Sequence, residues 1–353
     1  MTLISAEFWS GKRILLTGHT GFKGSWMALW LHRLGAKVTG VSLPPTSNPN
    51  LFNLAQIQDL TDSHFLDIRD AYGLAALIQK TEPEIIFHLA AQALVRTGYQ
   101  DPLTTFATNI QGTANLLDAV REITSVRVVL AVTTDKVYQN LERSTAYIET
   151  DLLGGYDPYS ASKAAAEMVI ACYRDSYLKE KGIAVASARA GNVIGGGDWS
   201  EDRLIPDAVR AWQEKIPLKI RRPEAIRPWQ HVLEPLAGYL VLAQKLWQNP
   251  KLAGAYNFGP NPKEVASVRA VIEQARQAVG VSEVIYEDGN VGPHEAGSLS
   301  LEISKAQSVL GFIPKWRLVE TVNRTMAWYA AQKLGAKARD LCEAEITAYE
   351  ASK

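Results

Sequence analysis

The sequence is poor in cysteine and carries no excess of either charge. Its 353 residues include two cysteines, Cys172 and Cys342, and 37 basic against 37 acidic side chains. Two cysteines are too few for a disulfide framework, and we expect Cys172 to pack in a helix rather than take part in chemistry. A net charge of zero, without a long basic run, gives no reason to expect nucleic acid as a partner.

Long apolar runs and metal-binding patterns are also lacking. No uninterrupted apolar segment approaches the roughly 20 residues that span a membrane. The first apolar run is short and leads straight into a glycine-rich segment, which is not the pattern of a signal peptide. No cysteine–histidine cluster has the spacing of metal ligands. We therefore expect a soluble cytoplasmic protein with no membrane partner and no metal.

Short apolar runs alternate with helical patterns along the first half of the chain. Hydrophobic residues make up 47% of the sequence, enough for a large core. The alternation predicts an α/β fold, a doubly wound parallel sheet with right-handed crossovers. Strands are predicted at 14–17, 37–42, 64–66, 84–90, 126–133 and 183–189. Helices are predicted at 25–34, at 70–80, from Asp101 (an N-cap before Pro102) onward, and at 159–177.

The pattern changes after Gly191, where glycines and prolines become frequent. This part is loop-rich and predicts a smaller α/β domain that covers a substrate, while residues 255–258 are expected to return as a last strand of the sheet. We predict a first domain of residues 1–190 with a returning segment at about 230–258. The second domain would consist of residues 191–229 and 259–353.

Three glycines, Gly18, Gly21 and Gly24, follow the first predicted strand and open the first predicted helix. This context is typical of a dinucleotide site. Gly18 permits a tight turn, Gly21 lets backbone N–H groups approach a pyrophosphate, and Gly24 lets the helix pack close to the strand. Residues 39–54 include no charged side chain that could pair with a 2′-phosphate, so NAD is favoured over NADP.

Tyr159 and Lys163 lie four residues apart in a predicted helix, so their side chains share one face. A tyrosine with a pKa of about 10 is a poor base at neutral pH. A neighbouring ammonium, together with a positive nicotinamide ring, would lower that pKa. Tyr159 could then take a proton from a carbinol as hydride leaves for the cofactor. The glycine turn and this pair together predict a redox enzyme.

These motifs resemble the extended short-chain dehydrogenase/reductase family over residues 12–316. The similarity lies at 17–24, 67–68, 89–92, 133–138 and 159–163. It implies a Rossmann-type domain that binds NAD, with Asp67 and Ile68 beside the adenine and Ala90 and Ala91 beneath the cofactor. The cofactor-binding residues that it implies are Gly18, His19, Thr20, Gly21, Phe22, Lys23, Gly24, Asp67, Ile68, Leu89, Ala90, Ala91, Tyr159 and Lys163.

His19 and Lys23 depart from the family pattern, which has small or apolar residues at these positions of the glycine turn. An imidazole adds bulk where the backbone must approach the pyrophosphate. We therefore expect weaker retention of NAD than in relatives.

The triplet Thr134-Asp135-Lys136 indicates the subclass. The family's sugar epimerases usually lack a paired acid and base here, whereas its nucleotide-sugar 4,6-dehydratases have one. The resemblance implies that Thr134 and Tyr159 bond the reacting sugar oxygen and that oxidation at C4 makes the C5 proton acidic. Lys136, with a depressed pKa, would remove that proton while Asp135 protonates the C6 hydroxyl, before hydride returns to C6. The alternative is a surface Asp–Lys pair at a strand end.

Longer stretches resemble the branch of the family that acts on CDP-glucose. They lie at 8–12, 24–26, 191–199, 202–207 and 227–232. The resemblance implies CDP-glucose as the substrate and CDP-4-keto-6-deoxyglucose as the product, a precursor of dideoxy sugars in surface polysaccharide. Arginine suits bidentate contact with a pyrophosphate, whereas each tryptophan could equally pack in the core. The predicted substrate-binding residues are Arg96, Asn192, Trp199, Arg203, Leu204, Arg221, Arg227 and Trp229.

Other functions stay open from the sequence. The chain could be a dehydratase or 4-epimerase for another nucleotide sugar, or a non-catalytic dinucleotide sensor, which would not need the intact Tyr159–Lys163 pair. The helices from Asp101 and at 159–177 are apolar over more than one stripe. We predict that they pack on their counterparts in a homodimer, with a tetramer also possible. Burial under the C-terminal segment is the alternative.

Overall fold

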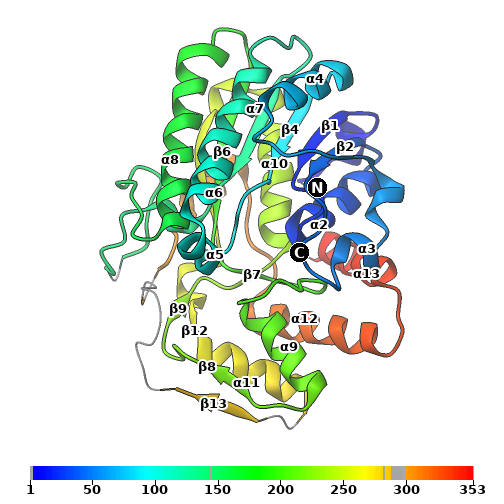
Figure 1. The fold of residues 1–353 in the computed structure, drawn as a ribbon, viewed down its shortest axis with the longest axis vertical. Helices are drawn as coiled ribbons and strands as arrows, with labels where there is room; N and C mark the ends of the chain where they lie inside the picture. The colour runs from blue at the N-terminus through cyan, green and yellow to red at the C-terminus, as the bar shows by residue number, and fades with distance from the viewer. Residues whose placement is uncertain (1–2, 144, 281–282, 288–296, 298, 353) are drawn as a thin grey trace.

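A seven-stranded parallel sheet forms the centre of the protein (Figure 1). The computed structural model describes residues 3–143, 145–280, 283–287, 297 and 299–352. The strands lie in the order β11-β6-β5-β4-β1-β2-β3, so the chain winds outward from β1 in both directions, which confirms the predicted doubly wound α/β fold. The strands are β1 (Arg13–Thr17), β2 (Lys37–Ser42), β3 (Asp62–Phe65), β4 (Ile85–His88), β5 (Val128–Val132), β6 (Ala184–Ala190) and β11 (Gly254–Phe258).

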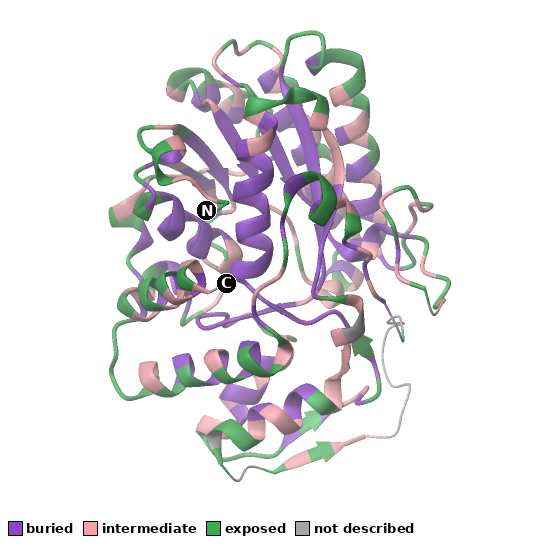
Figure 2. Ribbon diagram, turned by 180° about the vertical axis from the view of Figure 1, so that it is seen from behind, coloured by how far each residue is buried: buried purple, intermediate pink, exposed green. Residues whose placement is uncertain are grey.

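Two layers of helices cover the two faces of the sheet. Successive residues of a strand face opposite layers: Leu15 and Val129 pack with one set of helices, and Leu16 and Leu130 with the other. Burial is continuous through the central strands β4, β5 and β6 and covers most of the long helix α10 (Figure 2). The first layer consists of α4 (Ala71–Thr81), α7 (Gly112–Val120) and α8 (Pro158–Tyr173), and the second of α2 (Phe22–Arg33), α10 (Leu233–Gln248) and α13 (Ala338–Ala351).

A smaller group of elements lies beyond the carboxyl ends of the strands, at the bottom of Figure 1. The expectation of a loop-rich region is wrong for residues 204–214, which form α9 (Leu204–Glu214). Pro206 is the third residue of that helix, where the missing N–H would have no partner inside the helix. The other elements here are β7 (Val193–Ile194), β8 (Leu218–Ile220), β9 (Ile226–Arg227), β10 (Gln230–His231), β12 (Ala266–Ser267), α11 (Val268–Val279), β13 (Val284–Tyr286) and α12 (Leu318–Lys333).

Short helical segments connect the main elements. Asp101 caps α6 by accepting a hydrogen bond from the Thr104 N–H, and Pro102 is the first residue of that helix, as predicted. The remaining segments are α1 (Ala6–Trp9), α3 (Leu51–Leu54), η1 (Ile57–Leu60), α5 (Val95–Gln100), α6 (Pro102–Phe106), η2 (Ala107–Gln111), η3 (Asp135–Val137), η4 (Arg174–Leu178), η5 (Pro250–Leu252), η6 (Pro262–Glu264) and η7 (Ala306–Leu310).

The last helix, α13, packs against α2 near the start of the chain. In α2, Trp30 donates a hydrogen bond from Nε1 to Glu350 at 2.9 Å, and Arg33 forms an ion pair with the same carboxylate at 3.2 Å. Residues 338–351 therefore lie against the predicted first domain, although the expected boundary assigned them to the second. The division into two domains stays a prediction.

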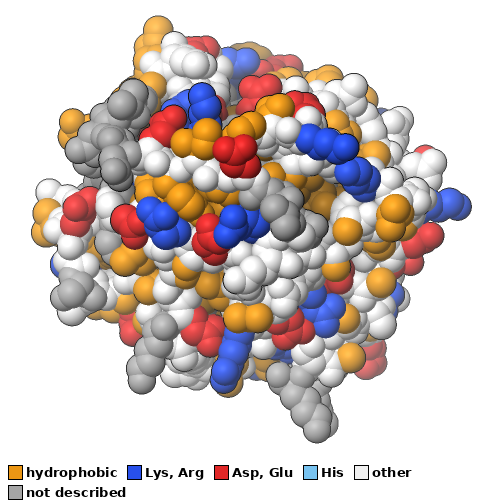
Figure 3. Space-filling view, turned by 90° about the horizontal axis from the view of Figure 1, so that it is seen from below, with side chains coloured by type: hydrophobic (Ala, Val, Ile, Leu, Met, Phe, Trp, Pro, Cys, Tyr) orange, Lys and Arg blue, Asp and Glu red, His pale blue; other side chains and the backbone are white. Residues whose placement is uncertain are grey.

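The two cysteines differ in burial. Cys342 is fully buried in α13. Cys172 lies in α8, as expected, but its side chain is exposed, so the expectation that it packs there is wrong. Within the described residues, no helix has the length and apolar character needed to cross a bilayer. On the face of the protein seen in Figure 3, basic and acidic side chains are interspersed.

A buried polar network joins α8 to the ends of β5 and β6. The Glu167 carboxylate accepts hydrogen bonds from the hydroxyls of Thr133, at 2.5 Å, and Ser187, at 2.8 Å. It also pairs with the Arg189 guanidinium at 2.8 Å, and both charged side chains are only 4% exposed. Each charge is stable in the interior because the other compensates it.

We expect Glu167→Gln to lower the free energy of unfolding by about 3–5 kcal/mol, because the substitution leaves the guanidinium of Arg189 buried without a counter-charge. Thr133→Val, which removes one neutral donor from the same carboxylate, should cost only about 1 kcal/mol. Urea unfolding followed by circular dichroism measures both. A Glu167→Gln loss no larger than that of Thr133→Val would contradict a dominant role for the ion pair.

A second buried carboxylate, Glu234, fastens the C-terminal segment to α10. Its Oε1 accepts hydrogen bonds from the backbone N–H groups of Lys315, at 2.9 Å, and Trp316, at 2.7 Å. Its Oε2 accepts from the Tyr349 hydroxyl at 2.6 Å. Burial raises the pKa of Glu234 to about 7, although these three donors act in the opposite direction.

Stability should fall as the pH rises through the raised pKa of Glu234. The folded protein holds this proton more tightly than the unfolded chain, whose glutamates titrate near 4.5. The resulting stabilisation is complete below pH 4.5 and is lost as the pH passes 7. Between pH 5 and pH 8, we expect the wild type to lose about 2–3 kcal/mol relative to Glu234→Gln. Urea unfolding of both proteins at several pH values measures this difference. If the free energy of unfolding changes with pH by the same amount in both proteins, the prediction is wrong.

Candidate active site

The glycine turn between β1 and α2 depends on contacts that exclude side chains. Gly18 has a φ of +78°, and a Cβ there would lie 2.7 Å from the backbone nitrogen of Ala90. A Cβ on Gly24 would lie 1.9 Å from the carbonyl oxygen of Gly18. Gly21 precedes the first residue of α2, and its N–H donates to that same carbonyl at 3.1 Å. The turn therefore leaves the first N–H groups of α2 open to an anion.

The neighbouring end of β4 is fixed by a buried histidine. Thr17 accepts a hydrogen bond from the Ala90 N–H at 3.1 Å, and its hydroxyl lies 2.8 Å from His88 Nδ1. His88 Nε2 lies 3.0 Å from the Thr113 hydroxyl. Burial, aided by the charge of Lys163, lowers the pKa of His88 to about 3, so the ring is neutral. These bonds hold the segment after β4 against the glycine turn.

His19 does not lie where the sequence led us to expect it. Its ring packs over β2, where a Cβ on Gly40 would lie 2.4 Å from His19 Cδ2, and it meets Phe52 edge-to-face at 5.4 Å. Its Nε2 hydrogen-bonds the Ser63 hydroxyl. Burial lowers the pKa of His19 to about 4. The ring therefore faces β2 and β3, and the expectation that it crowds a bound pyrophosphate is wrong.

Lys23, the other departure in the turn, faces the site. It is the second residue of α2, where the helix dipole disfavours a cation. Burial lowers the pKa of Lys23 to about 7, the charges of Arg203 and Lys163 lower it further, and Asp135 opposes them. A buried amine in such basic surroundings would be stabilised by an anionic ligand.

The predicted acid and base follow the end of β5. The Thr134 hydroxyl donates to Asp135 Oδ1 at 2.9 Å. The other oxygen, Oδ2, is buried and has no hydrogen-bond partner among the described residues. It lies beside Gly191, where a Cβ would approach it to 3.0 Å. Lys136, the residue after Asp135, is half-buried, and its backbone N–H donates to Thr134 Oγ1 at 3.4 Å.

Tyr159 and Lys163 lie on the first turns of α8. Lys163 donates from Nζ to the carbonyl of Val132 at 2.9 Å, and burial lowers its pKa to about 8. Burial raises the pKa of Tyr159 to about 12, against a hydrogen bond from Thr134 and the charge of Arg203. The lowering of the tyrosine pKa that we expected is therefore not supplied by the protein groups alone. The resemblance assigns part of it to a nicotinamide ring.

One cavity of about 1640 Å³ brings most of the predicted residues together. Leu204 and Trp229 instead line an adjoining cavity of about 210 Å³. His19 is the one predicted residue that lines neither. The predicted residues that line the large cavity are Gly18, Thr20, Gly21, Phe22, Lys23, Gly24, Asp67, Ile68, Leu89, Ala90, Ala91, Arg96, Thr134, Asp135, Lys136, Tyr159, Lys163, Asn192, Trp199, Arg203, Arg221 and Arg227.

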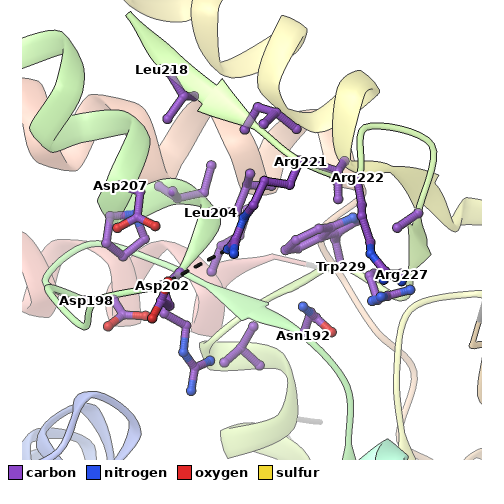
Figure 4. A pocket seen from close by; sticks show the side chains of 18 of the residues that line it. Asn192, Asp198, Asp202, Leu204, Asp207, Leu218, Arg221, Arg222, Arg227 and Trp229 are labelled. Atoms are coloured by element: carbon purple, nitrogen blue, oxygen red, sulfur yellow. Dashed lines mark ion pairs between the residues drawn. The ribbon is translucent and has the colours of Figure 1, made fainter. Parts of the chain in front are cut away.

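Arginines from separate segments line the adjoining cavity (Figure 4). Arg221 follows β8 and reaches across to Asp202, with 3.8 Å between Nη2 and Oδ1. Arg227, in β9, is buried and donates from Nη1 to the carbonyl of Ile226 at 2.8 Å. Arg203 precedes α9, and its charge acts on Tyr159. The cavity wall is therefore basic close to the predicted catalytic tyrosine.

The two predicted tryptophans belong to the hydrophobic core as well as to cavity walls. Trp199 is 7% exposed and meets Tyr329 edge-to-face at 5.3 Å. Trp229 is 5% exposed and donates from Nε1 to the carbonyl of Ala266 at 3.1 Å. Asn192 follows β6 and lines both cavities, and its buried Oδ1 lacks a partner within the described ranges. Each tryptophan can therefore offer a ligand only the part of its ring that borders a cavity.

Two residues that bear on the site were not predicted. Glu167 could have been found, because it lies four residues after Lys163 and so shares its helix face. Its charge raises the pKa of Lys163, against the lowering by burial. Asp202 belongs to a stretch that the sequence singled out, but nothing in that stretch indicated a pairing with Arg96, which is 106 positions away in the printed sequence.

The comparisons with known proteins agree with this geometry. The profile of the family described as GDP-mannose 4,6 dehydratase matches residues 15–325. The chain is 44% identical over 353 residues to a CDP-glucose 4,6-dehydratase from Salmonella typhimurium, covering 98% of each protein. It is 26% identical to a dTDP-glucose 4,6-dehydratase from Xanthomonas campestris pv. campestris, over 89% of this chain and 92% of that protein.

Solved structures share the fold. The structure of a UDP-glucose 4-epimerase from Thermotoga maritima superposes with a TM-score of 0.79 at 22% identity, over 91% of this chain and 99% of the other. A dTDP-glucose 4,6-dehydratase from Streptomyces venezuelae, solved with NAD, gives 0.78 at 25% identity, over 91% and 98%. From its match over most of its length, the chain belongs to the GDP-mannose 4,6 dehydratase family, whose relatives here are short-chain-dehydrogenase-type enzymes of nucleotide sugars.

Proposed function

We propose that the protein converts CDP-D-glucose to CDP-4-dehydro-6-deoxy-D-glucose and water, with NAD as its cofactor. The observation that carries the proposal is the meeting of Asp135, Lys136 and Tyr159 in one cavity with the glycine turn. An acid and a base beside a redox tyrosine are what an elimination coupled to oxidation requires. The relative from Salmonella typhimurium, at 44% identity over nearly the whole chain, supports CDP-glucose as the substrate.

The glycine turn fits a dinucleotide. A side chain at Gly18 or Gly24 would clash with the backbone, and the N–H groups at the start of α2 are open to a pyrophosphate. Asp67 is engaged by Arg69, whose guanidinium lies 2.6 Å from its carboxylate at the rim of the same cavity. We propose that Asp67 and Ile68 flank the adenine and that Ala90 and Ala91 lie under the cofactor. When bound, NAD would supply the acceptance and later return of one hydride.

The protein groups would move protons in a fixed order. Thr134 and Tyr159 bond the C4 hydroxyl, and Tyr159 takes its proton as the carbinol is oxidised. Lys163, held by the carbonyl of Val132, keeps a positive charge next to the phenolate. Lys136 then removes the C5 proton while Asp135 gives a proton to the C6 hydroxyl, so that water leaves. The unpartnered Oδ2 of Asp135 is the atom available for that transfer.

The basic wall suits the diphosphate of the substrate. Arg203, Arg221 and Asn192 line both cavities, and the side-chain amide of Asn192 carries N–H donors. Planar guanidinium groups bind phosphate oxygens in pairs. We propose that Arg96, Arg203, Arg221 and Asn192 hold the diphosphate and that the adjoining cavity, with Leu204 and Trp229, takes the cytidine.

Mass spectrometry of the reaction products tests the proposal. The pure protein is incubated with NAD and, in separate reactions, with CDP-glucose and with dTDP-, UDP- and GDP-sugars. We expect CDP-glucose alone to lose one water, with no net formation of NADH. Water loss from another sugar instead would contradict the choice of base. An unchanged mass for every sugar would reject a dehydratase, and chromatography of the products would then detect an epimer.

Tyr159→Phe tests the proposed base, because it removes only the hydroxyl that is proposed to take the C4 proton. We expect it to lower the rate of product formation by about 100-fold to 10,000-fold. Its binding of CDP, followed by calorimetry, should match that of the wild type. A variant with near wild-type activity would exclude Tyr159 as the base.

We also propose that the protein forms a homodimer through α6 and α8. Leu103 in α6 is 79% exposed, Met168 in α8 is 58% exposed, and Tyr177 in the following segment is 42% exposed. Ala164, one turn before Met168 on the same face of α8, is buried in a cluster with Leu301. The cover over this face therefore ends before Met168, and the part of α8 around Met168 is left for a second subunit.

Met168→Asp should shift the protein from dimer to monomer, because it introduces a charge into the proposed apolar contact. Sedimentation velocity measures the change in mass. Tyr72→Asp is the control, because Tyr72 lies in α4 and is 91% exposed outside this surface. A wild-type mass for Met168→Asp, or dissociation of both variants, would overturn the proposed interface.

A further inference from the structure

A single carboxylate oxygen bridges the two sides of the substrate cavity. Asp202 Oδ1 lies 3.0 Å from Arg96 Nη1 and 3.8 Å from Arg221 Nη2. Arg96 belongs to α5, which follows β4 of the central sheet, whereas Arg221 follows β8 in the smaller group of elements. Figure 4 shows Arg221 directed across the cavity toward this carboxylate.

Neither contact has the burial of a structural ion pair. The side chains of Arg96, Asp202 and Arg221 are 32%, 40% and 38% exposed, so water screens both pairs. Arg96 Nε is buried and has no hydrogen-bond partner in the part of the chain that the structure describes. Buried donors of this kind are normally satisfied, so Arg96 retains capacity for another acceptor.

Asp202 lies in a short segment that lines both cavities. It precedes Arg203, the residue at the start of α9, and its φ of +56° is in the left-handed region that few residues other than glycine adopt. Aspartate is one of the side chains that tolerate this conformation. The carboxylate is therefore presented to the cavity from a short loop, and a change of that loop can withdraw it without moving a helix of the core.

We propose that Asp202 is an internal anion that occupies Arg96 and Arg221 until the diphosphate of the substrate displaces it. This inference rests on the proposed function in that the ligand is a nucleoside diphosphate. In this exchange, the carboxylate of Asp202 leaves the guanidinium groups of Arg96 and Arg221, and phosphate oxygens of the ligand take its place. Part of the binding energy is spent on breaking the two existing contacts, and the ligand's diphosphate is required to break them.

Calorimetric titration of CDP into the protein with saturating NAD tests this exchange. We expect Asp202→Asn to bind CDP about threefold to fivefold more tightly than the wild type, the gain from removing a screened competitor. Cytidine, which has no phosphate, should bind both proteins equally. Glu201→Gln is the matched control: it removes an exposed charge from the adjacent residue of the same loop, and its CDP affinity should equal that of the wild type.

Equal or weaker CDP binding by Asp202→Asn would overturn the proposal, and so would an equal gain in Glu201→Gln, which would indicate a general effect of loop charge. If the Asn variant melts below the wild type, Asp202→Ser gives the same comparison. If the wild type binds UDP and not CDP, the proposed base specificity fails. The ratio of variant to wild-type affinity for UDP then decides the role of Asp202 independently.

Discussion

The buried pairing of Glu167 with Arg189 is the interaction on which the site depends. From Arg189, hydrogen bonds lead to the Tyr138 hydroxyl at 3.0 Å and from there to the Asn257 side chain at 2.6 Å. Asn257 lies in β11, and Arg189 in the adjacent β6. One connected set of polar groups thus joins the helix that bears Tyr159 to strands that the chain adds much later. In a low-dielectric interior such bonds are strong, although Arg189 Nε is buried without a hydrogen-bond partner among the described residues.

The position of the catalytic groups follows from this anchoring. Lys163 is one helical turn before Glu167 and bonds the last residue of β5, so the register of α8 on the sheet is fixed at two successive turns. The residues after β5 then face the same opening as α8. The arginines proposed to hold the substrate instead lie on separate short segments, with Arg96 in α5 and Arg221 after β8, and their ion pairs are partly exposed. In the proposed function, a rigid reaction centre is thereby combined with a binding wall that can rearrange.

The sequence predicted the middle of the sheet well because β4, β5 and β6 are buried on both faces and are largely apolar. The glycine turn and the Tyr159–Lys163 pair were equally readable, because the function proposed for them requires fixed spacing. The predictions failed where contacts between distant parts of the chain decide the local structure. His19 turns toward β2 since Gly40 leaves room for its ring, and α9 was hidden by a proline in its first turn. The contact between Asp202 and Arg96 depends on loop conformation, which no local pattern encodes.

The contact between Trp30 and Glu350 has a consequence for the order of folding. A chain emerging from the ribosome presents the glycine turn and α2 early, but Trp30 of α2 packs against α13, which ends near residue 350. The edge strand β11 likewise arrives after residue 253. The first half of the molecule therefore stays incomplete through most of synthesis, and such intermediates are the ones that chaperones protect from aggregation.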